Sequence, residues 1–473
     1  MIQELKPYPE YKDSGAPWLG EIPAHWRCLP HRAVFREVKD QGHKDEPLLS
    51  VTISRGVIQQ SELLAESSKK DSSNLDKAKY KLVVPGDIAY NKMRAWQGAI
   101  GSSHHRGIVS PAYIVVRPRI SHNPDYFHFL FRTPAFATEA ERWSYGITSD
   151  QWNLRSEHFK MIYSCVPPRP EQDAVVAFLR QFESKVRRFI RNRRRLIELL
   201  NEQKQAIINQ AVTRGLDPYV PLKPSGIDWL GGIPEHWEVK RLKNLGQGII
   251  GLTFAPQDLT DEEGTLVLRA SNIRNGKLVF GKDVFVRTRI PGKLWVTSGD
   301  ILICSRSGSR GLIGKSALIP EGLSASFGVF MSVFRSEIND FIYCILNSRI
   351  FNYLAAGFAT STINQLTLRE LHELIVPLPP RHEQLRIVQF ITHHGIETDQ
   401  AIERARREIE LIREYRSRLI ADVVTGKVDV RHLAREIAEP DTEDLESLRI
   451  DGVIDDEMSG EDEAEIVEEK VND

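Results

Sequence analysis

Two stretches of the chain carry apolar residues at the spacing of a two-stranded coiled coil. Each stretch follows a Pro-Pro-Arg-x-Glu-Gln segment and continues without proline for about 40 residues, to Thr213 or Thr425. A proline followed by Glu in the first turn is typical of a helix start. The apolar positions recur at sevens and at threes or fours, and they are Ile190, Ile197, Leu200, Ile207 and Ala211, then Ile402, Ile409, Ile412, Leu419 and Val423. This pattern predicts two long helices that pair antiparallel, with Gly395 as a candidate interruption of the second.

The alternative is that each helix belongs to the core of its own globular domain. The narrow seam and its charged flanks, such as Arg187 and Arg191, favour the pair. Before each helix, about 150 residues alternate short β-branched and aromatic runs with Gly and Pro, a pattern typical of strands and turns. We predict an α+β protein with two mixed α/β domains, related by pseudo-two-fold symmetry and separated by the helices. The expected parts are domain one (1–169), helical spacer one (170–216), domain two (217–379), helical spacer two (380–428) and an acidic, disordered tail (434–473).

The two halves repeat each other in sequence. The segment Trp-Leu-Gly-x-Ile-Pro-x-His-Trp occurs at 18–26 and again at 229–237, an offset of 211. The blocks around Gly86-Asp87, the Pro-Pro-Arg-x-Glu-Gln segment and the Ile-Glu-Leu of the helix return at offsets of 212 or 213. Several blocks in one order at nearly one offset indicate a duplicated unit.

Charge divides the chain in a way that the average conceals. Residues 434–473 hold 17 acidic and 3 basic side chains, a net of −14, while the 60 basic and 47 acidic residues before them give +13. A basic body suits a polyanion such as nucleic acid, although a basic globular protein with a solvating tail remains the alternative. The four cysteines form no Cys-x-x-Cys, the N-terminus has no apolar signal-peptide core, and no apolar run spans a membrane. We expect a cytoplasmic protein.

The repeated Trp-Leu-Gly-x-Ile-Pro-x-His-Trp segment, the Pro-Pro-x-x-Glu-Gln helix start and the duplication resemble the specificity subunit of type I restriction–modification enzymes. The resemblance covers roughly residues 10–430. It implies two target-recognition domains that each read one half of a bipartite sequence in double-stranded DNA. It also implies helices that set the gap and dock two methyltransferase (modification) subunits, together with ATP-dependent restriction subunits. S-adenosylmethionine, ATP and Mg²⁺ are then expected in those partners, with no cofactor in this chain. The acidic tail departs from the pattern.

Motifs for catalysis are missing from the sequence. The Pro-Pro pairs lack the preceding Asn or Asp and the following aromatic residue of an adenine methyltransferase. Gly314-Lys315-Ser316 ends like a phosphate-binding loop, but Ser309 stands where the first glycine is required. Asp87 and Asp300 are interpreted as turn formers, and no His pair has metal-ligand spacing. We therefore predict a non-catalytic subunit without a metal site.

Candidate DNA-reading residues are Arg, Lys, Asn, Gln and hydroxyl side chains in loops, because such groups bond to base edges and phosphates. In the first half they are Ser54, Arg55, Asn91, Lys92, Arg94, Gln97, Thr148, Ser149 and Gln151. In the second half they are Arg269, Asn272, Arg274, Lys277, Arg306, Ser307, Arg310, Thr360, Ser361 and Asn364. A solvated loop residue is the alternative for any one of them.

Aromatic residues complete the predictions. Trp26 and Trp237 are expected to pack at the chain entry rather than to stack on bases. Phe182, Phe189 and Tyr415 are assigned to outer faces of the coil, either to dock partner helices or to seal the domains. Two other functions compete with sequence-specific DNA recognition: an enzyme with degenerate motifs, and a coiled-coil DNA-binding scaffold without sequence preference.

Overall fold

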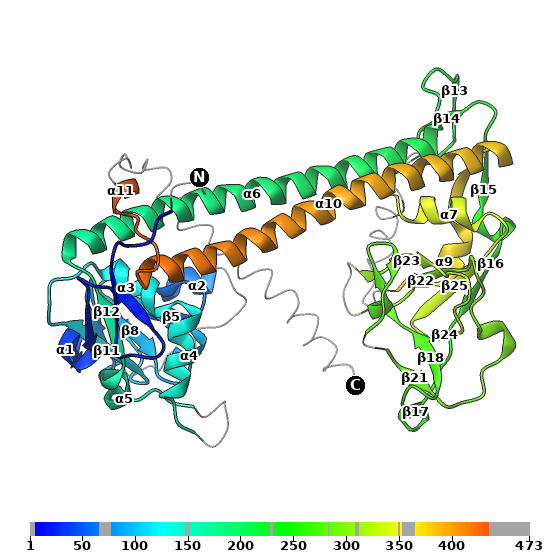
Figure 1. Ribbon diagram of the computed structural model, residues 1–473. Coiled ribbons are helices and arrows are strands. Elements are labelled where there is room, and N and C mark those ends of the chain that lie inside the picture. Colours follow the sequence, from blue (N-terminus) through cyan, green and yellow to red (C-terminus); the bar gives the residue numbers. More distant parts are fainter. Residues whose placement is uncertain are drawn as a thin grey trace. The chain divides into compact units, whose positions relative to one another are not determined.

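The computed structural model describes residues 5–65, 77–146, 152–227, 230–281, 283–307, 312–348, 351 and 365–434. The chain forms two compact units. Unit 1 is Met1–Arg193 with Arg407–Asp473, and unit 2 is Arg194–Arg406. Figure 1 shows that each unit contains a β-rich domain, part of one long helix and part of the other. The α+β prediction with two β-rich domains and two long helices is therefore confirmed.

The long helices are α6 (Arg169–Arg214) and α10 (Arg381–Val424), and Gly395 lies inside α10 without interrupting it. The predicted seam positions are buried or half-buried along both helices. The buried members are Ile190, Ala211, Ile402, Ile409, Leu419 and Val423, and the others are half-buried. Burial of one apolar stripe on each helix explains why helices with so many charged residues pair stably.

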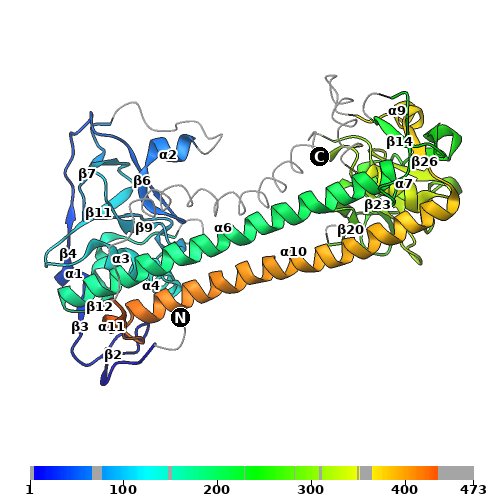
Figure 2. The ribbon, with the colours of Figure 1, turned by 90° about the horizontal axis from the view of Figure 1, so that it is seen from above.

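The helices pair antiparallel within each unit, which confirms the prediction. In unit 1 the ring of Phe182 lies 5.9 Å from that of Tyr415. In unit 2, Lys204 Nζ donates to Asp399 Oδ1 at 2.5 Å. Within unit 1, Arg193 Nε also lies 2.6 Å from Glu408 Oε2, so residue numbers that rise along α6 meet numbers that fall along α10, as Figure 2 shows. The assignment of Phe182 to an outer face is wrong: its side chain is buried against Tyr415 because an aromatic ring fills the seam there.

Unit 1 is built around an antiparallel four-stranded sheet in the order β4-β11-β8-β9. Four separate two-stranded sheets, β1-β2, β3-β12, β5-β6 and β7-β10, hold the remaining strands. The strands are β1 (Tyr11–Asp13), β2 (Glu21–Pro23), β3 (Arg27–Pro30), β4 (Phe35–Val38), β5 (Leu49–Thr52), β6 (Gly56–Gln59), β7 (Lys81–Val83), β8 (Ile88–Asn91), β9 (Ile100–Ser102), β10 (Gly107–Val109), β11 (Tyr113–Pro118) and β12 (Tyr163–Val166). The short helices are α1 (His31–Val34), α2 (Gln60–Ala65), α3 (Pro124–Phe131), α4 (Pro134–Arg142), α5 (Ser156–Met161) and α11 (Arg431–Ala434).

Unit 2 repeats this arrangement with a sheet in the order β16-β25-β22-β23. The pairs β13-β14, β15-β26 and β19-β20 correspond to β1-β2, β3-β12 and β5-β6, and the sheet β17-β21-β18-β24 is added. The strands are β13 (Leu222–Pro224), β14 (Gly232–Pro234), β15 (Glu238–Arg241), β16 (Gln247–Ile250), β17 (Leu259–Thr260), β18 (Thr265–Leu268), β19 (Ile273–Arg274), β20 (Lys277–Leu278), β21 (Phe285–Val286), β22 (Ile301–Cys304), β23 (Ser316–Leu318), β24 (Ser326–Phe327), β25 (Met331–Arg335) and β26 (Ile375–Leu378). Its short helices are α7 (Asn339–Leu346) and α9 (Leu368–Glu373).

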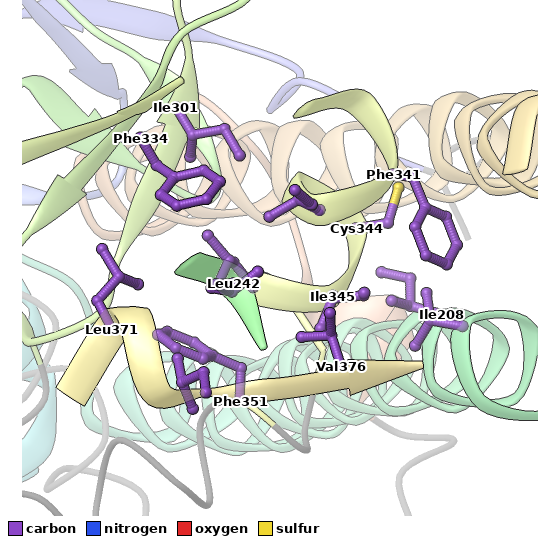
Figure 3. Close-up of a cluster of buried hydrophobic side chains, with 14 of the residues drawn as sticks. Ile208, Leu242, Ile301, Phe334, Phe341, Cys344, Ile345, Phe351, Leu371 and Val376 are labelled. Carbon is purple, nitrogen blue, oxygen red and sulfur yellow. The ribbon is translucent and has the colours of Figure 1, made fainter. Parts of the chain in front are cut away.

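The core of unit 2 joins the sheet to the end of α6. Figure 3 shows Ile208 of α6 in the same buried cluster as Leu242, Phe334 and Val376. Burial of these apolar side chains holds α6 against the domain, because each such side chain removed from water contributes roughly 1.5–3 kcal/mol. The helix is therefore part of the unit's own core.

The corresponding core of unit 1 contains a buried histidine. His31 is fully buried, Ser164 Oγ lies 2.7 Å from its Nε2, and the ring of Phe159 lies 4.4 Å away. Burial lowers the pKa of His31 to about 3. In unit 2, Leu242 and Val376 stand at the positions that His31 and Ser164 occupy in unit 1. The backbone shows this correspondence, because His31 N donates to Ile162 O as Leu242 N donates to Leu374 O.

We expect unit 1 to lose stability in mild acid. Burial also lowers the pKa of His128, on α3, to about 3. Below about pH 6.5 the unfolded chain binds a proton at each of these imidazoles and the folded unit does not. The part of the free energy of unfolding that depends on these two neutral imidazoles is thus fully present above pH 6.5 and is lost as the pH drops toward 3. At pH 5 each histidine should lower the free energy of unfolding by about 2 kcal/mol, measurable by urea denaturation between pH 8 and 5.

The control is the pair of substitutions His31→Leu and Ser164→Val, which copies the apolar pair found in unit 2. This variant should lose about half of the pH dependence while it stays folded at pH 8. An unchanged pH profile would show that His31 is not the titrating group.

Candidate nucleic-acid interface

The start of α6 and the end of α10 meet at Trp26. Glu171, in the first turn of α6, accepts hydrogen bonds from Trp26 Nε1 (3.0 Å) and from the Tyr8 hydroxyl (2.6 Å). His25 Nε2 donates to the second oxygen of Glu171 at 2.8 Å. Gly426 follows α10 at φ +83°, and a Cβ there would lie 2.9 Å from the Trp26 ring, so only glycine fits. The repeated sequence segments thus attach both long helices to the domain, and packing of Trp26 is confirmed.

The same joint exists in unit 2, with the helices exchanged. Glu383, in the first turn of α10, accepts from Trp237 Nε1 (3.0 Å) and from His236 Nε2 (2.6 Å). Burial alone would raise the pKa of Glu383, but these hydrogen bonds outweigh it and hold the pKa below its usual value. Gly215 follows α6 at φ +76° with its Cβ position 3.3 Å from Trp237. The prediction that Trp237 packs is confirmed.

Asp87 and Asp300 are turn formers, as predicted. Asp87 Oδ2 accepts from Val84 N at 3.1 Å, and Asp300 Oδ2 accepts from Thr297 N at 2.8 Å. Each carboxylate is also paired with an arginine of the adjacent strand, Arg117 at 2.7 Å and Arg335 at 3.0 Å. These charges stabilise the sheet and are occupied within the fold.

The first-half candidates that the structure describes lie at two neighbouring loops of unit 1. Ser54 and Arg55 form the tip of the β5-β6 hairpin, and the second loop follows β8. A Cβ placed on Gly98 of the second loop would lie 3.9 Å from the carbonyl oxygen of Ile53, so the loops are in contact. The exposed candidates are Ser54, Arg94 and Gln97, and the half-buried ones are Arg55, Asn91 and Lys92. This groups charged and amide side chains suited to base edges and phosphates.

An aromatic pair beside these loops was missed in part by the sequence analysis. The rings of Trp96 and Trp152 lie 5.2 Å apart at an interplanar angle of 66°. Leu154 N donates to Lys92 O at 2.8 Å and brings the segment after Gln151 against the loop after β8. Trp152 adjoins a candidate residue in sequence, and that was the available signal for it.

In unit 2 the β19-β20 hairpin presents Arg274 and Lys277, both exposed, at its tip. Arg269 is half-buried. Asn272 is buried: its amide nitrogen donates to Val279 O (3.1 Å) and to Asp283 Oδ1 (2.8 Å). Asn272 therefore shapes the hairpin rather than facing solvent.

Arg306 and Ser307 follow β22, as the first-half loop follows β8. The Arg306 guanidinium lies 5.5 Å from the centre of the Phe330 ring, which is 55% exposed. Leu366 N donates to Ser305 O at 2.7 Å, the counterpart of the bond from Leu154 to Lys92. The remaining candidates lie outside the described residues: Thr148, Ser149, Gln151, Arg310, Thr360, Ser361 and Asn364.

Two further features concern the described ranges only. Within them, no three His, Cys, Asp or Glu side chains are grouped so as to hold a metal ion. None of the helices found there combines the length and the apolar character that crossing a membrane requires. All four cysteines are free thiols.

Comparisons with known proteins show similarity to type I restriction specificity proteins. A family model described as the type I restriction modification DNA specificity domain matches residues 234–411. A putative type I restriction enzyme MjaX specificity subunit of Methanocaldococcus jannaschii is 26% identical over 446 residues, which cover 87% of this chain and 96% of that protein. The type I restriction enzyme EcoKI specificity subunit of Escherichia coli is 26% identical over 206 residues, 42% of this chain and 44% of that protein.

One solved structure shows the same fold. A chain from a structural study of complex assembly and conformational transition in the type I R-M system aligns with a TM-score of 0.65 at 16% identity. The alignment covers 86% of this chain and 99% of that chain. At this identity the match establishes the fold of two β-rich domains with long helices.

Proposed function

Because the chain belongs to the DNA specificity subunits of type I restriction–modification systems, we propose that each of its units reads one half of a bipartite target in double-stranded DNA. The specificity subunit is a non-catalytic component of such a system. The observation that carries this proposal is the repeated placement of a hairpin tip and of the loop after the central strand, β5-β6 with β8 and β19-β20 with β22. The exposed side chains there differ between the units, as two readers of different half-sites require.

Arginine on these loops supports direct reading. Arg94 in unit 1 and Arg306 in unit 2 are exposed on corresponding loops, and a guanidinium can donate two hydrogen bonds to guanine in the major groove. Lys92 supplies charge for phosphate contacts, which position the protein without reading sequence. The predicted DNA-binding residues within the described ranges, apart from the buried Asn272, are proposed on this basis.

The long helices are proposed to set the gap between the half-sites and to dock two methyltransferase subunits. In support, α6 and α10 each begin at one Trp joint and end at the other, so both halves of the chain are linked by continuous helix. Restriction subunits are proposed as further partners in the cytoplasm. In this scheme the methyltransferase subunits bind S-adenosylmethionine and the restriction subunits use ATP and Mg²⁺.

The test is methylation of random-sequence duplexes by the chain together with its methyltransferase subunits, read by sequencing. We expect a consensus of two defined segments separated by unspecified bases. Arg94→Ala should relax one segment and Arg306→Ala the other, each by about 10- to 100-fold in discrimination. The exposed Arg142→Ala is the matched control and should change neither segment. A consensus without two parts, or methylation by this chain alone, would refute the proposal.

A further inference from the structure

Arg132 connects the two candidate reading loops of unit 1. It caps the C-terminal end of α3, and its guanidinium donates to Ile53 O at 2.7 Å and also to Ser54 O, both at the β5-β6 tip. The same group donates to Gly98 O at 3.2 Å and to Ile100 O at 3.4 Å, on and after the loop that follows β8. One side chain thus holds four backbone carbonyls, which only a planar multi-donor group can do.

His128, one helical turn before Arg132, leaves little space between α3 and the backbone at the two loops. His128 packs against the backbone of both loops, because a Cβ on Gly56 would lie 2.8 Å from its Cε1 and a Cβ on Gly101 would lie 2.9 Å from its Nδ1. Gly56 also has φ +74°, where a side chain is strained. The hairpin tip therefore rests directly on α3, without room for adjustment.

Unit 2 reaches the same arrangement with different residues. Tyr343 on α7 donates its hydroxyl to Gly276 O, at the β19-β20 tip, at 2.6 Å. A Cβ on Gly276 would lie 2.7 Å from that hydroxyl and 3.3 Å from Asn347 Oδ1, one helical turn later. Tyr343 and Asn347 thus occupy the places of His128 and Arg132.

In unit 1 the supporting helix α3 is itself fixed to α6, and in unit 2 the hairpin tip is fixed directly to α10. In unit 1, Asp125 of α3 pairs with Arg180 of α6 and lies 2.8 Å from His104 Nε2. In unit 2, Asp399 of α10 accepts from Lys204 of α6 and, at 3.0 Å, from Lys277 of the hairpin tip. Burial alone would raise the pKa of Asp399, but the hydrogen bonds and charges of the two lysines hold it below its usual value.

We propose that Arg132 in unit 1 and Tyr343 in unit 2 are positioning residues for DNA sequence reading: each locks a hairpin tip in the pose from which its exposed side chains meet the bases. This inference rests on the proposed function. Neither residue needs to touch DNA, because both act on backbone carbonyls of the reading loops. Base reading requires donors held within about 0.5 Å, which a mobile hairpin tip does not provide.

The test compares Arg132→Lys and Tyr343→Phe in the complex with the methyltransferase subunits. Lysine keeps the charge but lacks the planar fork, and phenylalanine removes only the hydroxyl. We expect Arg132→Lys to reduce discrimination at the half-site read by unit 1 by at least tenfold, with the other half-site read as before. Tyr343→Phe should give the reciprocal pattern. Binding to non-cognate duplex and its salt dependence should stay unchanged, since phosphate contacts do not need the tip pose.

Arg142→Gln, on the neighbouring α4, is the matched control and should leave both half-sites unchanged. Equal losses at both half-sites with a lowered melting temperature would show a merely structural role and overturn the inference. Unchanged discrimination in both variants would also overturn it. If the wild-type complex itself yields no bipartite consensus, the proposed function fails. If instead the wild type and both variants read the same two half-sites equally well, only the inference about Arg132 and Tyr343 fails.

Discussion

Replacing Trp26 with alanine is expected to lower the free energy of unfolding of unit 1 by about 4 kcal/mol. The side chain is fully buried and lies where α6 begins and α10 ends. Its removal leaves a large cavity and deprives the buried Glu171 of a hydrogen-bond donor. The loss should appear in urea or thermal denaturation, with weaker DNA binding as its consequence.

Two variants separate the causes of this loss. Trp26→Phe keeps most of the packing and removes the hydrogen bond to Glu171, so it should cost less than alanine. Tyr219→Ala, at a residue that is 91% exposed, should leave the stability unchanged. A stability of Trp26→Ala equal to wild type would contradict the role of this joint.

Removing one heptad from each long helix is expected to abolish methylation of the parental target and to create a new one. Deleting residues 194–200 and 401–407 keeps the apolar seam in phase and shortens the pair by about 10 Å, or roughly three base pairs. The two half-sites should stay the same while the gap between them shortens. Because three base pairs also turn the duplex by about 100°, methylation of the new target should be weaker than that of the parental one. Sequencing of the methylated products measures all of these changes.

The matched control removes five residues from each helix at the same places. Such a deletion turns the seam by about 140°, so it should lower the melting temperature rather than yield a shorter gap. A parental gap retained after the heptad deletion would refute the proposal that the helices set it.

The sequence was sufficient for features that depend on local pattern or on repetition. The helix starts, the seam and the packing of Trp26 and Trp237 follow from spacing and from segments that occur twice. The turn role of Asp87 follows from its place after glycine. These features recur because the same short-range chemistry builds both units.

The remaining features depend on contacts between residues far apart in the chain. Nothing near Arg132 in sequence shows that its guanidinium reaches the carbonyls of Ile53 and Gly98. Asn272 has a side-chain amide of the kind that reads bases, yet the fold turns this amide inward to Val279 and Asp283. Phe182 was assigned outward because a helical pattern alone does not fix which aromatic residue completes the seam.

The division of the chain has a consequence for its integrity. Unit 1 contains residues from both ends of the chain and unit 2 the middle, so the backbone crosses between them twice, once in α6 and once in α10. A single protease cut in either helix would leave the other crossing whole. The two units would then stay covalently joined, and only cuts in both helices would separate them.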